Sequence, residues 1–293
     1  MIPSWRVFCK TLPLLLGLGL LLSACSRVEL IYRNLDWLLP WRLEHYLDLD
    51  RQQRAWLEPR LRAHLDWHCS RELPRNLAWL QRSRELVEQP QVSAAQLVEH
   101  LAEVDAALQR IAVQVTPTAI DLLRSLGAEQ VAELESVLRA DYHDDRRSFL
   151  DPPLARQIDE RAARLERRLQ PWFGRLNAAQ RRHLALWSQA LGEQNRLWLS
   201  NRLRWQSELL AALAARDSAA FPARLTRLLQ ARESFHDAEY RDAYSRARQA
   251  AAELLSQLLG SADVRQRRRL SQRLAQLSRD LAEQLCAASP ARA

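Results

Sequence analysis

Two histidines and a cysteine lie close enough in the sequence to bind one metal ion. His64 and His68 are four residues apart, so on a helix they share a face, and Cys69 follows directly. This spacing can present two imidazoles to a zinc ion. However, no glutamate follows His64, as a metalloprotease helix would require, and no third ligand is near. We therefore predict neither a metal site nor a cofactor.

A second group combines carboxylates with an imidazole, as acid–base catalysis requires. Asp141, His143, Asp144 and Asp145 lie together at the expected end of a helix. Arg146 adjoins them, and arginine beside a carboxylate normally lowers its pKa and forms a solvated ion-pair network. The cluster therefore supports a hydrolase only as an alternative. A further acidic group consists of Asp36, Glu44, His45, Asp48 and Asp50.

The signatures of common enzymes are absent from the sequence. It contains no Gly-x-Ser-x-Gly elbow, no P-loop and no Cys-x-x-Cys pair. Of its six glycines, Gly17 and Gly19 lie in an apolar N-terminal segment, so few remain for phosphate-binding loops. Catalytic groups are found disproportionately on loops, which this composition does not favour. We therefore predict that the protein is not an enzyme.

The N-terminal segment has the layout of a lipoprotein signal peptide, residues 1–24. Basic residues precede an apolar run at 12–22 that is too short to span a bilayer. The sequence Leu22-Ser23-Ala24-Cys25 resembles the bacterial lipobox. This resemblance implies cleavage after Ala24 and attachment of lipid to Cys25.

Export also determines what the remaining cysteines can do. Once the signal peptide is removed and Cys25 is acylated, Cys69 and Cys286 are left. An oxidising compartment permits a disulfide between them, but they are far apart in the sequence. The sequence leaves open whether they pair or stay buried as thiols.

The chain is basic, with a formal net charge of +8, and Lys10 is its only lysine. Arginine pairs bidentately with carboxylates and phosphates, which suits ion pairs between helices as well as anionic partners. Near the C-terminus, one amphipathic segment carries Arg265, Arg267, Arg268, Arg269 and Arg273. It can lie on anionic lipid or bind acidic polymers, or it can be a solvated face over a core stripe. Export argues against nucleic acid as a partner.

Repeated helix-start signals predict an all-α fold. Asp50, Ser93, Gly127 and Asn177 each stand three residues before a glutamine, with an aliphatic residue just outside, as in a capping box. No window alternates as a strand would. We predict a multi-helix bundle of about eight to ten helices behind the signal peptide, with no sheet. The residues between the boxes align at no fixed period, so a duplicated unit does not follow.

Proline and apolar spacing predict where the helices begin and end. Asp151-Pro152-Pro153 divides an N-terminal helical region, 25–151, from a C-terminal region, 152–293, which we expect to pack with the first as one body. We expect a helix at 93–115, a new one from Thr116-Pro117, one long helix at 177–215 and another at 221–259. The apolar stripe of the 93–115 helix consists of Leu97, Leu101, Val104, Leu108 and Ile111.

A mixed aromatic and basic stripe is our candidate for binding a partner. Trp198, Arg202 and Trp205 recur at i, i+4 and i+7, so they share one face of a helix. Tryptophan and arginine are the side chains most enriched at the energetic centres of interfaces.

The N-terminal half resembles a known group of proteins. Behind the lipobox come Tyr32-x-x-Leu35-Asp36-Trp37, Trp41, Tyr46-x-Asp48-Leu49-Asp50, Gln53, Leu57, Trp67-His68 and Leu73-Pro74. This arrangement resembles a family of uncharacterised proteobacterial lipoproteins. The resemblance implies a helical outer-membrane lipoprotein, and it brings no known activity. Ser26 in place of aspartate is what such proteins show when they are passed on to the outer membrane.

The helix starts are also similar to the Leu-Thr-x-x-Gln signature of small periplasmic chaperones that respond to envelope stress, with threonine replaced here. We therefore expect a lipid-anchored outer-membrane lipoprotein that faces the periplasm. It would act by binding, chaperone-like holding or scaffolding, with an envelope protein or anionic polymer as partner. The alternatives are a hydrolase of envelope polymers and a basic module of the membrane surface.

Overall fold

The computed structural model describes residues 35–284 of the chain, and this part consists of helices joined by short turns. The helices are α4 (Leu35–Leu47), α5 (Arg51–Trp67), the π-helical η1 (His68–Glu72), α6 (Leu73–Glu88), α7 (Ala94–Arg124), α8 (Ala128–Phe149), α9 (Leu154–Phe173), α10 (Ala178–Leu191), α11 (Gln194–Ala214), α12 (Phe221–Gln230), the 3-10 helix η2 (Arg232–Phe235), α13 (Ala238–Gly260) and α14 (Val264–Gln284). The predicted all-α fold is confirmed. None of the helices described is long and apolar enough to cross a membrane.

The predicted capping boxes start the helices that the sequence assigned to them. The side chains of Asp50, Ser93 and Asn177 each accept the backbone N–H three residues on, while the glutamine there accepts the cap's own N–H. Gly127 has no side chain, and only the glutamine half of the box forms, with Gln130 Oε1 accepting its N–H at 2.9 Å. Asp263 adds a box that we did not predict, since Gln266 N donates to Asp263 Oδ1 at 2.8 Å.

Four of these glutamines also pair with one another across the fold. Gln53 Nε2 donates to Gln130 Oε1 at 3.1 Å, and Gln130 Nε2 donates to Gln53 Oε1 at 2.8 Å. Gln180 and Gln266 exchange the same two bonds, at 2.9 and 3.1 Å. A primary amide is both donor and acceptor, so two facing amides can satisfy one another in the interior. Each pair therefore joins the starts of two helices that are distant in the sequence.

These pairs reveal two halves with the same order of helices. In the first half the paired glutamines start α5 and α8, and in the second half they start α10 and α14. On this basis α4 corresponds to α9, the segment α5–η1–α6 to α10–α11, α7 to α12–η2–α13, and α8 to α14. The contacts agree, because α8 packs on α4 and α11, while α14 packs on α9 and α6. The two halves thus share their order of helices and these contacts, although the sequence showed no fixed period.

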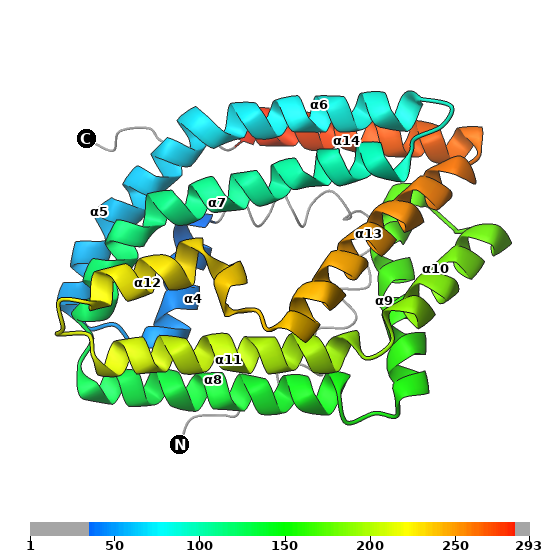
Figure 1. Ribbon diagram of the computed structural model, residues 1–293. Coiled ribbons are helices and arrows are strands. Elements are labelled where there is room, and N and C mark those ends of the chain that lie inside the picture. Colours follow the sequence, from blue (N-terminus) through cyan, green and yellow to red (C-terminus); the bar gives the residue numbers. More distant parts are fainter. Residues whose placement is uncertain (1–34, 285–293) are drawn as a thin grey trace, which may run out of the picture.

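The halves are interlocked. In Figure 1, α14 lies beside α6 along one side of the molecule, and α8 lies beside α11 along the opposite side. Each half therefore places its last helix on the other half. The division at residue 151 separates the two sets of helices along the chain, and the two sets pack against one another as well as within themselves.

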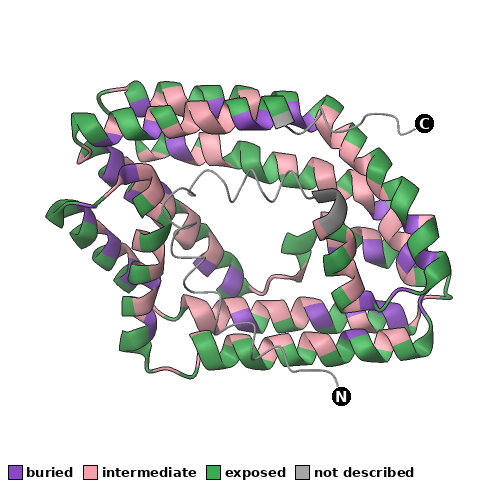
Figure 2. Ribbon diagram, turned by 180° about the vertical axis from the view of Figure 1, so that it is seen from behind, coloured by how far each residue is buried: buried purple, intermediate pink, exposed green. Residues whose placement is uncertain are grey.

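The described residues form three hydrophobic cores, each with residues from both halves, and Figure 2 shows the buried residues distributed along the packed helices around the molecule. The first core comprises Leu47, Leu49, Leu57, Leu122, Leu126, Leu134, Leu209, Ala212, Leu213, Phe221, Leu225 and Leu228. The second core comprises Val87, Val92, Leu97, Phe173, Leu176, Leu184, Ala252, Leu254, Leu258, Leu259 and Leu270. In the first core, the end of α11 and the helix α12 pack against α5 and α8, and in the second core the end of α6 and the start of α7 pack against α10 and α14.

Two of the expected single helices are broken, for different reasons. The helix expected at 177–215 stops at Gly192, whose φ of 46° favours glycine, and the Arg161 guanidinium binds the Ser188 and Gly192 carbonyls at 2.9 Å. The helix expected at 221–259 is interrupted by η2. Asp237 then caps a new helix by accepting Tyr240 N–H at 2.7 Å.

The opposite error occurs in α7, which continues through Pro117 instead of restarting at Thr116. Proline removes one backbone donor, yet the buried face runs on from Thr116 to Leu122. Packing on both sides of the proline keeps the helix continuous.

A buried glutamate ties η1 to α7. Glu72 has no exposed surface and accepts Arg110 Nε at 2.9 Å, Arg110 Nη2 at 2.8 Å and Arg75 Nη1 at 2.6 Å. The hydrogen bonds from Arg110 lower the pKa of Glu72, and burial opposes this only in part. Charge-assisted bonds of this kind are the stronger ones in proteins.

We predict that Glu72→Gln destabilises the protein at pH 7 by about 1.5–3 kcal/mol, because charge-assisted bonds to two arginines are lost. The folded-state pKa of Glu72 is lowered. The stabilisation is therefore present above the unfolded pKa of about 4.3, and it is lost as the pH falls toward the folded value. Urea unfolding at pH 7 and pH 3 checks this, with Glu85→Gln on the exposed side of α6 as control. An equal difference from wild type at both pH values contradicts it.

Candidate functional site

The predicted partner-binding residues Trp198, Arg202 and Trp205 share one face of α11, where all three are half-buried. Trp205 packs against the first core, and its indole N–H donates to the Leu228 carbonyl at 3.0 Å. Arg202 forms an ion pair with Asp145 of α8 and lies 3.7 Å from Asp141 Oδ2. The polar groups of Arg202 and Trp205 thus serve the α8–α11 and α11–α12 contacts, and their role in binding a partner stays a prediction.

The acidic cluster of α8 is split between two faces of the helix. Asp141 and Asp145 point toward α11, and Tyr46 OH donates to Asp141 Oδ2 at 2.7 Å. That hydrogen bond, with burial, raises the pKa of Tyr46. His143 and Asp144 are exposed, and Asp144 forms an ion pair with Arg147 at 2.5 Å. The histidine and the carboxylates therefore do not surround one concave site.

His64 in α5 and His68 in η1 are not part of a metal-binding cluster among the described residues. His64 Nε2 lies 2.8 Å from Thr118 Oγ1 of α7, and burial lowers the pKa values of both His64 and His68. Within residues 35–284, no three histidine, cysteine or acidic side chains are placed to hold a metal ion.

Cys69 lies in η1, just before α6. Leu281 near the end of α14 packs against Leu73 at the start of α6, so the described chain ends on the same side as Cys69. Cys286, the lipidation site Cys25 and the cleavage site at Ala24 lie outside the described residues. The disulfide between Cys69 and Cys286 stays a prediction.

The arginines of α14 divide into an inner and an outer set. Arg267 donates to the carbonyls of Val87, Gln89, Pro90 and Leu259, at 2.6–3.1 Å, and so holds the α6–α7 turn. Arg265, Arg268 and Arg269 are exposed. The basic segment is therefore partly a structural clamp and partly a solvated face.

The middle of α7 carries an apolar surface whose exposure the sequence did not predict. Its stripe is buried at one end by the second core, through Leu97, and at the other by the first core, through Leu122. Between them Val104 is 39% exposed and Leu108 is 58% exposed. Because α7 has 31 residues, it spans about 45 Å, and the cores cover only its ends. Its apolar periodicity predicted burial along the whole stripe.

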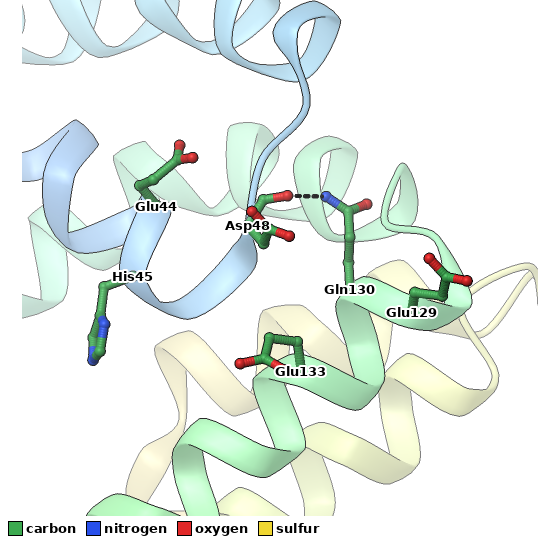
Figure 3. A pocket seen from close by; sticks show the side chains of 6 residues that line it. All are labelled: Glu44, His45, Asp48, Glu129, Gln130 and Glu133. Atoms are coloured by element: carbon green, nitrogen blue, oxygen red, sulfur yellow. Dashed lines mark hydrogen bonds between the residues drawn. The ribbon is translucent and has the colours of Figure 1, made fainter. Parts of the chain in front are cut away.

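A hollow of about 400 Å³ lies between α4 and the start of α8. It is lined by Glu44, His45, Asp48, Glu129, Gln130 and Glu133. Figure 3 shows the carboxylates turned in different directions around Gln130, whose Nε2 donates to the Asp48 carbonyl at 2.7 Å. Glu44 forms an ion pair with Arg54 at 2.6 Å. The site is acidic, but its carboxylates do not converge on one point.

Within residues 35–284, the helices and their contacts define an all-α protein of two interlocked halves. The sequence profile of a family of unknown function, DUF6279, matches residues 45–241. The match covers more than half of the chain, so the protein belongs to this family. No curated protein and no solved structure matches the chain.

We predict that Trp205→Phe lowers the free energy of unfolding by about 1–3 kcal/mol, since it leaves the Leu228 carbonyl without its donor. Trp198→Phe on the same helix is the matched control and should cost less. The Trp198 ring makes an edge-to-face contact with Phe149, and the Arg202 guanidinium lies over it. Chemical denaturation checks both variants. If Trp205→Phe leaves stability unchanged, this indole has no structural role and is free to serve a partner.

Proposed function

We propose that the protein is a non-catalytic binding protein of the cell envelope, with a chaperone-like or scaffolding role. It would be a lipoprotein held through lipid on Cys25 at the periplasmic face of the outer membrane. The lipobox resemblance supports the anchor, and the family membership assigns no competing activity.

The observation that carries the binding role is the uncovered stripe of α7. Leu101, Val104, Leu108 and Ile111 follow one face of the helix at spacings of three and four, and none of them is fully buried. Exposed contiguous apolar surface is characteristic of interaction sites. An extended or unfolded polypeptide can place apolar side chains along such a stripe, with the ends of α7 held rigid by the two cores.

The two alternatives have less support. A hydrolase needs its histidine and carboxylates around one substrate, whereas His143 and Asp144 face solvent and Asp145 pairs with Arg202. A module of the membrane surface would have to use the exposed Arg265, Arg268 and Arg269, because Arg267 is occupied by backbone carbonyls.

We predict that Leu108→Ser weakens binding of an unfolded model protein about tenfold, because burying one leucine contributes about 1.5–3 kcal/mol. The assay is suppression of light scattering when a urea-unfolded protein is diluted into buffer. Val113→Ser is the matched control, because Val113 lies on another face of the same helix and is 50% exposed. Equal activity of both variants and wild type removes the stripe from the binding role.

The anchor requires its own test. We predict that Cys25→Ala releases the protein from the outer membrane or leaves it with an uncleaved signal peptide, because the acyl chains have no thiol to join. Membrane fractionation and the size of the mature band measure this. Unchanged outer-membrane fractionation with a mature-sized band refutes the anchor and leaves the proposed binding role of α7 untouched.

A further inference from the structure

Gln130 and Gln266, one from each glutamine pair, define equivalent positions at the two ends of the molecule. Gln130 Nε2 donates to the carbonyl of Asp48, and Gln266 Nε2 donates to the carbonyl of Arg175. Asp48 and Arg175 therefore occupy the same place relative to their glutamine. Both precede a box-started helix, α5 in one half and α10 in the other.

The neighbours of these glutamines extend the correspondence. Glu129 stands one residue before Gln130, and Arg265 stands one residue before Gln266. Glu133 and Arg269 each stand three residues after their glutamine, at the next turn of α8 and α14. We call Asp48, Glu129 and Glu133 the acidic end, and Arg175, Arg265 and Arg269 the arginine end. At all three positions the charge is inverted between the two halves.

All six side chains are exposed, and none of them forms an ion pair within residues 35–284. In contrast, Glu44 beside the acidic end is paired with Arg54. Arg269 Nε donates to the Pro171 carbonyl at 3.1 Å, and its aliphatic part lies near Gly174. This contact positions the arginine side chain while its charge stays without a carboxylate partner among the described residues.

The fold itself does not select either charge at these positions. The same glutamine pairing forms beside three carboxylates in one half and beside three arginines in the other. In addition, the residue four positions after each paired glutamine is a buried leucine in both halves: Leu57, Leu134, Leu184 and Leu270. Since the paired glutamines and the buried leucines are equivalent and the exposed charge differs, the charges are available to groups outside the described residues 35–284.

The two ends also differ in their surroundings. The acidic end lines the hollow between α4 and α8, whereas the three arginines of the other end are exposed on the surface. In Figure 1 the start of α8 and the start of α14 lie at opposite corners of the molecule. One copy can therefore present its arginine end to the acidic end of a second copy without blocking its own acidic end.

We propose that copies of this chain associate head to tail, with Arg175, Arg265 and Arg269 of one copy paired with Asp48, Glu129 and Glu133 of the next. Arginine binds carboxylates bidentately, which gives such pairs a defined geometry. The two surfaces are different, so the contact is heterologous and continues from copy to copy instead of closing a two-fold dimer. The pairs are exposed, so the association weakens as salt screens them.

The experiment uses the full-length protein in detergent and three double variants. Each variant changes the net charge by the same amount. One reverses the acidic end, Glu129→Arg with Glu133→Arg, and one reverses the arginine end, Arg265→Glu with Arg269→Glu. The control, Arg241→Glu with Arg246→Glu, changes two exposed arginines of α13 away from both ends. Sedimentation velocity at low and high salt measures association, and urea unfolding verifies that each variant is folded.

We predict that wild type and control associate at low salt and dissociate at high salt. Each end-reversed variant alone should associate about tenfold or more weakly, because like charges then meet. A mixture of the two end-reversed variants should regain association, since each supplies the charge that the other lacks. This recovery distinguishes pairing of the ends from a loss of folding.

Three results overturn the proposal. The first is a wild type that remains monomeric at low salt, and the second is a mixture that stays as monomeric as its components. The third is an arginine-end variant that associates normally but loses binding to vesicles containing phosphatidylglycerol, which would assign the arginine end to lipid phosphate instead.

Discussion

The reciprocal hydrogen bonding of two glutamine pairs is the constraint on which the rest of the fold depends. Each pair fixes two helix starts together, and each amide has the donors and acceptors to satisfy its partner and a nearby carbonyl. A buried amide left without its partner would lose the hydrogen bonds that offset its desolvation. The pairs therefore specify which helices meet, while the leucines four residues later supply the apolar area.

From this constraint follows the separation of the two cores. The two larger cores each lie beside one glutamine pair, at the two ends of α7, and α7 spans the distance between them. The exposed middle of α7 follows from this separation, whereas the opposite charges at the two ends are not determined by the packing of the helices. The proposed binding stripe and the proposed contact between copies therefore lie on separate surfaces.

Local signals in the sequence predicted where several helices begin, but they did not predict where a helix is interrupted or continues. Asp50, Ser93 and Asn177 were recognisable as caps because capping depends on residues three apart. The break at Gly192 depends on Arg161, and the continuity of α7 through Pro117 depends on packing by distant helices, so neither is encoded locally. The exposure of Val104 and Leu108 likewise depends on distant helices, so their helical spacing alone predicted a buried stripe. Arg202 and Trp205 had the spacing of a binding surface, but their polar groups contact neighbouring helices. The pairing of Gln53 with Gln130 could not be read from a single capping box.

The position of α14 on α6 has a consequence for how the chain reaches its native state. The last described helix covers Leu73 and Leu80, which lie early in the sequence, through Leu281. Contacts of such large sequence separation slow folding, because a long loop must close before they form. A chain delivered from its N-terminus leaves α6 without its neighbour until nearly all residues have emerged. The fold can therefore be completed only after the C-terminal helix has emerged. Chains truncated before α14 keep the apolar surface of α6 exposed, and quality-control proteases can recognise such a surface.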